Sequence, residues 1–121
     1  MNLVQIAQHA DDLDRAADFY TMLIGRPPLA RFDPPGLVFF DLDGARLLLD
    51  RAAPSALLYL RVDNVHETLE ELGALVDVVS APHVIFTHDD DTLGPQGFEE
   101  WQAFIRDSEG NTVGLVAFQR A

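Results

Sequence analysis

Two histidines stand at the ends of short apolar runs, where an imidazole could act as an acid or a base. His9 closes the run at residues 3–9, and His83 opens the run HVIFTH at residues 83–88. Because a free imidazole titrates near neutral pH, either ring could exchange a proton with a bound substrate. His9 and His83 are therefore the candidate catalytic residues.

The remaining histidines suggest less chemistry. His88 ends the same run as His83, and a separation of five places the two on opposite faces of a regular strand. His66 falls within a predicted helix, where we expect a structural role. The acidic segment HDDDTLG at residues 88–94 lacks the ligand spacing and the final Glu of a calcium loop, which favours a solvated loop.

Aromatic side chains could form the floor of an apolar pocket. The candidates are Phe39, Phe40, Tyr59, Trp101 and Phe104. Strand alternation predicts that about half of them lie in the core instead. Trp101 is the one that we favour for the pocket, because an indole can stack on a flat ligand and still donate a hydrogen bond.

The elements that would position these residues follow from apolar periodicity and turn signals. In the first half, a strand at residues 3–9 precedes a helix that Asp11 or Asp12 caps and Gly25 ends. Three short strands follow at residues 29–33, 36–42 and 45–50. The predicted order of the first half is therefore β-α-β-β-β.

The second half repeats this order after the linker at residues 52–56. A strand at 57–62 precedes a helix that Asp63 or Asn64 caps and Gly73 ends. Strands are then predicted at residues 74–80, 83–88, 101–107 and 112–118.

The chain is an internal duplication. DLDGARLLLD at residues 41–50 and DSEGNTVGLV at residues 107–116 share a D-x-[D/E]-G turn followed by an apolar strand. The same order of strands and helix in both halves is the mark of a repeat. We expect the polar loop near residues 89–99 to hold most of the extra length of the second copy.

The strands predict two faces with different environments. Leu47 and Leu49 share one face of the strand at 45–50, and Val113 and Leu115 share one face of the strand at 112–118. This Leu/Val face is the natural one to bury beneath a helix. The opposite face is the candidate pocket wall, which carries Gln5, Ala7, His9, Leu48, Leu57, Tyr59, Arg61 and Gly114.

Three segments together resemble the vicinal oxygen chelate superfamily: DLDRAADFYTMLIG, LYLRVDNVHETLEELGA and FIRDSEGNTVGL. This superfamily includes glyoxalase I, bleomycin-resistance proteins, fosfomycin-resistance enzymes, methylmalonyl-CoA epimerase and extradiol dioxygenases. The resemblance covers residues 3–118. It implies an α+β fold of two βαβββ modules in tandem, whose curled mixed sheets surround a shared concave pocket, often across a homodimer.

The resemblance also implies where a metal would bind. In metal-dependent members, His or Gln on each first strand and Glu on each last strand are the ligands. Carried onto this chain, these positions are Gln5, Leu57, Leu48 and Gly114. Only Gln5 offers a donor atom, and one neutral amide cannot hold a divalent ion. We therefore expect no metal and no other cofactor.

A second arrangement stays open. A related branch of the superfamily carries Gln in the first strand and a P-H…H…E-x-W-x-x-F segment, which matches Pro82, His83, His88, Glu99 or Glu100, Trp101 and Phe104. Gln5, His83 and His88 could then form a relocated site for a divalent metal such as Zn, Ni, Mn or Fe. Alternatively, one of these histidines is a hydrogen-bonded pocket residue and the other lies on the surface.

The composition limits the partners. The formal net charge is −12, and all eight basic residues are Arg. Such acidity disfavours nucleic acid and could attract a cationic small molecule. No apolar run reaches the ~20 residues of a membrane span, and the first residues show no basic n-region of a signal peptide. There is no cysteine, and we expect a cytoplasmic protein.

The length of 121 residues predicts one domain, residues 1–121, with modules at 1–51 and 56–121. Open sheets leave unpaired edges, so we expect a homodimer. We hypothesise that the protein binds a small hydrophobic or cationic molecule, without metal, in a pocket lined by Gln5, His9, Leu48, Leu57, Tyr59, Arg61, Trp101 and Gly114. The alternative is a lyase or isomerase of the glyoxalase type that uses a relocated metal or a bare histidine.

Overall fold

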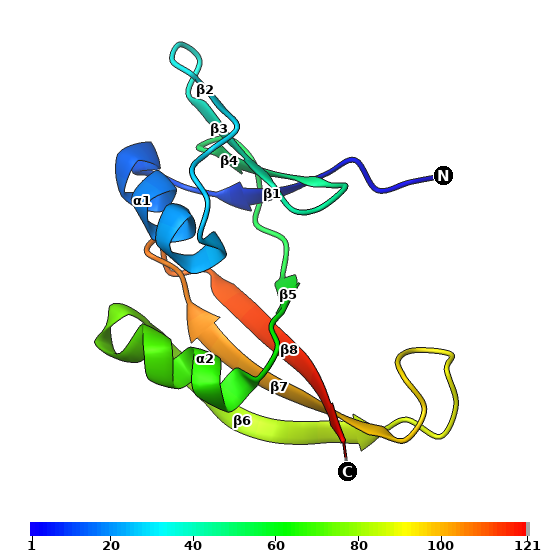
Figure 1. Cartoon of the computed structure of the whole chain (residues 1–121). Coiled ribbons are helices and arrows are strands. Elements are labelled where there is room, and N and C mark those ends of the chain that lie inside the picture. The colour runs from blue at the N-terminus through cyan, green and yellow to red at the C-terminus, as the bar shows by residue number, and fades with distance from the viewer. Residues whose placement is uncertain (121) are drawn as a thin grey trace. The chain divides into compact units, whose positions relative to one another are not determined.

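Two compact units make up the chain in the computed structural model, which describes residues 1–120. The first unit contains residues 1–56 and 107–111, and the second contains residues 57–106 and the chain from 112 onward. Each unit has one α-helix and one open four-stranded mixed sheet, in the order β-α-β-β-β (Figure 1). The α+β fold with two such units is the one that the sequence predicts.

The first unit begins with β1 (Gln5–His9) and α1 (Leu13–Ile24). Asp12 caps the helix by accepting a hydrogen bond from the backbone N–H of Arg15, and Gly25 ends it in the left-handed region at φ 79°. The strand order is β1-β4-β3-β2, with β1 parallel to β4. The three strands after the helix are β2 (Ala30–Phe32), β3 (Leu37–Asp41) and β4 (Arg46–Asp50).

The core of the first unit lies between α1 and the sheet. The buried helix residues are Leu13, Ala16, Ala17 and Tyr20, and the buried strand residues include Val38, Phe40, Leu47 and Leu49. Each fully buried large apolar side chain contributes about 1.5–3 kcal/mol relative to exposure. The expected Leu47/Leu49 face is therefore the buried one.

The turn at residues 107–111 belongs to the first unit, although it joins two strands of the second. Asp107 Oδ1 accepts hydrogen bonds from the backbone N–H groups of Glu109 (2.9 Å) and Asn111 (2.8 Å). Arg15 donates to the Glu109 carboxylate at 2.7 Å, and this hydrogen bond lowers the pKa of Glu109 to about 2.

The first copy of the repeated turn shares one side-chain hydrogen bond with the second. Asp41 Oδ1 accepts a hydrogen bond from the backbone N–H of Asp43 at 3.1 Å, as Asp107 does from Glu109. Arg26 lies 3.2 Å from the Asp41 carboxylate. The shared D-x-[D/E]-G sequence thus provides the same Asp-to-backbone hydrogen bond in both turns.

The second unit contains β5 (Leu58–Arg61) and α2 (Val65–Leu72), which Asn64 caps through the backbone N–H of Glu67. A short 3₁₀ turn, η1 (Gly73–Leu75), follows the helix. The sheet has the order β5-β8-β7-β6, with β5 parallel to β8. The remaining strands are β6 (Asp77–Thr87), β7 (Phe98–Arg106) and β8 (Thr112–Arg120).

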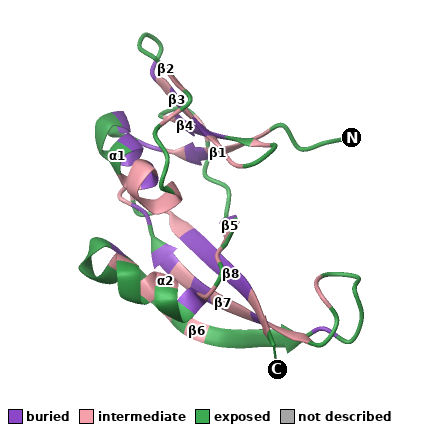
Figure 2. Ribbon diagram, in the orientation of Figure 1, coloured by how far each residue is buried: buried purple, intermediate pink, exposed green. Residues whose placement is uncertain are grey.

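The prediction of separate strands at 74–80 and 83–88 is wrong, because β6 is continuous from Asp77 to Thr87. Pro82 is tolerated within it, since β6 is an edge strand and its pairing with β7 shifts register between Ser80 and His83. Most of β6 is exposed (Figure 2).

The extra length of the second copy is not mainly in the loop. β6 has 11 residues where β2 has 3, and β7 has 9 where β3 has 5. The loop between β6 and β7 spans only residues 88–97. The longer β6–β7 hairpin therefore takes more of the insertion than the loop does, contrary to expectation.

The side chains of β7 and β8 alternate between the two faces of the second sheet. Val113, Leu115 and Ala117 of β8 are buried, together with Ala103 and Ile105 of β7. Gly114 and Val116 alternate with them onto the opposite face. In the part of the chain that the structure describes, no helix has the length and apolar character needed to cross a membrane.

Candidate functional site

An open cavity of about 390 Å³ lies in the second unit. This volume falls within the range of small-molecule pockets. Residues of β5, β7, β8 and the β6–β7 loop line it, namely Tyr59, Arg61, Leu93, Glu100, Gln102, Val116 and Phe118.

The alternation of β7 explains how polar side chains reach this cavity. Glu100 and Gln102 point to the cavity, whereas Ala103 and Ile105 are buried on the other face. Glu100 is paired in register with Phe118 on β8, which also lines the cavity. The cavity wall is therefore built from residues that face one another across neighbouring strands.

A buried hydrogen-bond network of His88, Glu100 and Gln102 supports the wall. His88 Nε2 lies 3.0 Å from Glu100 Oε1, and Gln102 Nε2 donates to Glu100 Oε2 at 2.8 Å. His88 is 5% exposed and Glu100 is 9% exposed. When Glu100 is ionised, its carboxylate only accepts hydrogen bonds, and Nε2 of His88 is then the donor. Both carboxylate oxygens of Glu100 thus have partners, as a buried charge requires.

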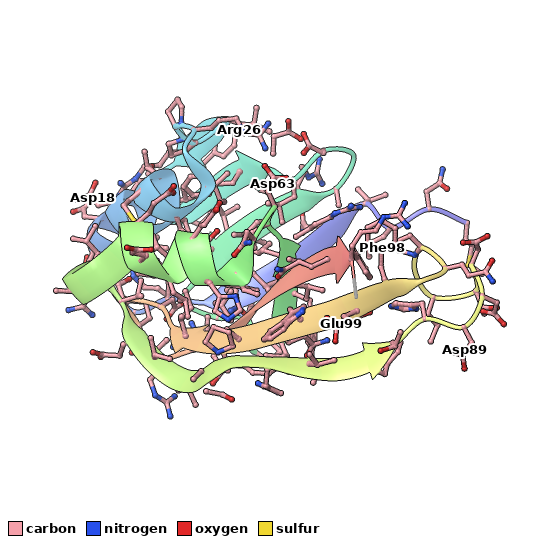
Figure 3. All side chains as sticks on the ribbon, turned by 60° about the horizontal axis from the view of Figure 1, so that its bottom comes forward. Asp18, Arg26, Asp63, Asp89, Phe98 and Glu99 are labelled. Carbon is pink, nitrogen blue, oxygen red and sulfur yellow. The ribbon has the colours of Figure 1, made fainter. Side chains whose placement is uncertain are left out.

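The β6–β7 loop closes over His88. The rings of Phe86 and Phe118 lie 4.6 Å and 5.5 Å from the His88 ring. A Cβ at Gly94 would lie 2.7 Å from His88 ring atoms, so only glycine allows this approach. Asp89 lies in this loop and Phe98 at its end (Figure 3).

Two charged groups of the loop region and cavity face solvent. Hydrogen bonds from Thr92 lower the pKa of Asp90. The guanidinium carbon of Arg61 lies 5.0 Å from the centre of the Phe118 ring. Cation–π geometry of this kind leaves the N–H edges of the guanidinium available.

Gly114 was expected to line the pocket, but it lies against the rings of Tyr59 and Phe104. A Cβ there would lie 3.0 Å from ring atoms of both Tyr59 and Phe104. These two rings are in edge-to-face contact, with centroids 5.9 Å apart. The space over Gly114 is therefore filled by the protein's own aromatic pair, and it is not open to a ligand.

The predicted second-unit residues occupy several environments. Tyr59 and Arg61 line the cavity. Trp101 lies on the other face of β7, where its ring centre is 4.8 Å from that of His66 in α2. Leu57 precedes β5 and is half exposed. His83 is exposed on β6, with Nδ1 2.8 Å from the carbonyl oxygen of Ala81.

The prediction did not include Gln102 or Phe118, and it placed Glu100 only as a motif alternative to Glu99. The signal for the polar pair is the sequence EWQA at residues 100–103, in which polar and apolar side chains alternate. Strand alternation in this segment places Glu100 and Gln102 together on one face of β7.

The predicted first-unit residues are already engaged in local contacts. Gln5 Oε1 accepts a hydrogen bond from Arg46 Nε at 3.1 Å. His9 Nε2 lies 2.9 Å from an Asp11 carboxylate oxygen. Leu48 is buried in β4.

The inherited metal positions do not fit a metal ion. Leu48 and Leu57 carry no donor atoms, the place of a side chain at Gly114 is taken by two rings, and the Gln5 oxygen is bonded to Arg46. Within residues 1–120 no group of three His, Asp or Glu side chains is arranged to hold a metal. For the alternative set, Gln5 lies in the first unit and both His83 and His88 lie in the second.

Comparisons with known proteins give structural matches alone. No protein-family model and no curated protein matches the chain. A lactoylglutathione lyase from Agrobacterium tumefaciens is 26% identical with a TM-score of 0.68, covering 96% of this chain and 92% of that one. A glyoxalase/bleomycin resistance protein/dioxygenase from Alicyclobacillus acidocaldarius is 18% identical with a TM-score of 0.65, covering 97% and 91%. A glyoxalase/bleomycin resistance protein from Albidiferax ferrireducens is 15% identical with a TM-score of 0.64, covering 95% and 98%.

Proposed function

Because the chain has the fold of the vicinal oxygen chelate superfamily, we propose that it binds a small hydrophobic or cationic molecule, without metal, in the cavity of the second unit. The observation that carries this proposal is the cavity itself. Tyr59, Leu93, Val116 and Phe118 give it apolar walls, and a few polar groups stand among them. Pockets for small molecules commonly combine these two features.

The charges in the cavity favour the hydrophobic ligand over the cationic one. Glu100 is the one carboxylate among the lining residues, and His88 and Gln102 already occupy its oxygens. Arg61 adds a positive charge to the same cavity. A flat, uncharged apolar ligand between Tyr59 and Phe118 would not be repelled by the charge of Arg61.

The neutral probe 2-naphthamide tests this proposal. We expect chelator-treated protein to bind it in calorimetric titration, and Tyr59→Ala to weaken the binding about tenfold through lost apolar contact. Trp101→Phe is the matched control, because Trp101 lies on the other face of the sheet and its loss should leave affinity unchanged. If 2-naphthamide, the cation 2-naphthylmethylammonium and the anion 2-naphthoate all fail to bind at millimolar concentration, the proposal is wrong.

A lyase or isomerase of the glyoxalase type is the second candidate, and the buried His88–Glu100 pair is the observation in its favour. Glu100 reaches the cavity, so it could accept a proton from a carbon next to a carbonyl group. The ketone 2-acetonaphthone in D₂O provides a test. Exchange of its methyl hydrogens that depends on the protein and disappears in Glu100→Gln would favour an enzyme over a binding protein.

A further inference from the structure

Arg61 differs from the other arginines whose partners are side-chain carboxylates. Arg15 pairs with Glu109, and Arg31 lies 2.6 Å from Asp14. Within residues 1–120 no carboxylate lies within ion-pair distance of Arg61, and its ring contact is with Phe118. Among the residues that the structure describes, Arg61 is the arginine that lines the cavity, and no carboxylate is paired with it there.

Strand pairing and the Phe118 ring position the Arg61 guanidinium in the cavity. Arg61 ends β5 and is paired in register with Val116 of β8, so its backbone position is fixed by the sheet. Its guanidinium lies over the Phe118 ring at 5.0 Å. Stacking uses the flat face of the group and leaves its N–H edge free to donate two parallel hydrogen bonds.

The one lining carboxylate does not compete for this edge. Glu100 Oε1 lies 3.0 Å from His88 Nε2, and Oε2 accepts from Gln102 at 2.8 Å. Both oxygens are thus committed within the buried network. The cavity therefore offers a guanidinium without a carboxylate partner beside apolar walls, while both oxygens of its one carboxylate already have hydrogen-bond partners.

We propose that Arg61 is a carboxylate-binding subsite, so that the natural ligand is a small organic acid with a flat apolar body. The planar guanidinium matches a carboxylate in a two-bond arrangement. The apolar body would lie against Tyr59 and Phe118, and Gln102 could bond a polar edge. The protein's net charge of −12 opposes an anion only weakly at physiological salt, where the screening length is about 8 Å. This inference rests on the proposed binding of a small molecule with an apolar body, and it assigns that ligand a carboxylate in place of a cationic group.

Three isosteric probes test the subsite: 2-naphthoate, 2-naphthamide and 2-naphthylmethylammonium. Calorimetric titration at 50 mM NaCl should show 2-naphthoate binding about tenfold more tightly than 2-naphthamide, as a charge-assisted bond to arginine requires. At 500 mM NaCl this preference should shrink, because screening acts on the charged pair.

Arg61→Met should bring the affinity for 2-naphthoate down to that for 2-naphthamide, because Met keeps an apolar stem against Phe118. The matched control is Arg120→Met, which removes an arginine that lies 4.5 Å over Phe98 and does not line the cavity. Arg120→Met should still bind 2-naphthoate more tightly than 2-naphthamide. An unchanged melting temperature of each variant confirms that the fold is intact.

The possible failures are distinguishable. Equal affinities for the acid and the amide, or tightest binding of the amine, would overturn the carboxylate subsite and leave the binding function standing. A preference for the acid that survives in Arg61→Met would also overturn it. Absence of binding by all three probes would overturn the binding function and the subsite together.

Discussion

Tyr20 donates a hydrogen bond of 2.7 Å from its phenol to Asp107 Oδ2, across a sequence separation of 87 residues. Both residues are buried. Burial raises the pKa of Tyr20, so the phenol stays protonated and remains a donor at physiological pH. This bond holds the 107–111 turn against α1.

Tyr20→Phe should therefore lower the free energy of unfolding by about 1.5–3 kcal/mol, the range for hydrogen bonds to charged groups. Urea denaturation measures the change. Tyr59→Phe is the control, because Tyr59 is half exposed and its hydroxyl has no hydrogen-bond partner among residues 1–120. Its loss should cost less than about 0.5 kcal/mol. Equal effects of the two variants would contradict this account of the turn.

The Arg15–Glu109 pair predicts a stability that depends on acidity. The pKa of Glu109 falls from 4.5 to about 2 on folding, chiefly through its hydrogen bond with Arg15. The stabilisation is complete above pH 4.5 and is lost as the pH falls towards 2. Melting temperatures measured from pH 6 to pH 2 should fall less steeply in Arg15→Ala than in the wild type. Arg46→Met, whose partner Gln5 is uncharged, should keep the wild-type slope.

Gly114→Ala should destabilise the protein by about 1–3 kcal/mol, the usual effect of overpacking. The new Cβ would lie 3.0 Å from the Tyr59 and Phe104 rings, which must move. Chemical denaturation of Gly114→Ala alone and together with Tyr59→Ala tests this reason. The cost of the alanine should shrink when Tyr59 is absent, and equal costs in both backgrounds would show that the rings are not responsible.

Metal content gives a direct test of the metal-free proposal. Purified protein should contain well under one equivalent of Zn, Ni, Mn, Fe or Co by elemental analysis. Because the inherited ligand positions are Gln5, Leu48, Leu57 and Gly114, chelator should leave the melting temperature unchanged. Stoichiometric metal, lost together with several degrees of melting temperature on chelation, would point to a relocated site.

The unpaired edge of β6 supports the prediction of a homodimer. Val78, Val79 and Ile85 expose 40–50% of their surface on this edge strand, and such edges tend to be covered by another chain. Light scattering at micromolar concentration should give twice the chain mass of 13.4 kDa. Ile85→Lys should shift the population towards monomer. A wild-type mass of one chain would rule the dimer out.

Local signals predicted the helices and the buried faces well. Asp12 caps α1 and Gly25 ends it, and Val113 and Leu115 are buried as alternation requires. These features depend on neighbouring residues in the sequence, so the sequence suffices to find them.

Features that depend on partners distant in sequence were harder to predict. Pro82 has no backbone N–H and therefore signals a break between strands. An edge strand tolerates proline, because β6 pairs with β7 on one side and has no partner strand on the other. Strand alternation places Trp101 and Glu100 on opposite faces of β7. Only the contact between Trp101 and His66 shows that α2 covers the face with Trp101. Gly114 suggests an open space until Tyr59 and Phe104 are known to fill it.

The 107–111 turn has a consequence for how this chain can be divided. Its contacts lie with residues such as Tyr20, Arg15 and His9, while its two flanking strands, β7 and β8, belong to the other unit. A gene cut at the linker after residue 56 would encode a first half without the carboxylates that bind Tyr20 and Arg15. The first fragment should therefore be less stable alone than in the whole chain, and addition of the second fragment should restore the contacts of this turn.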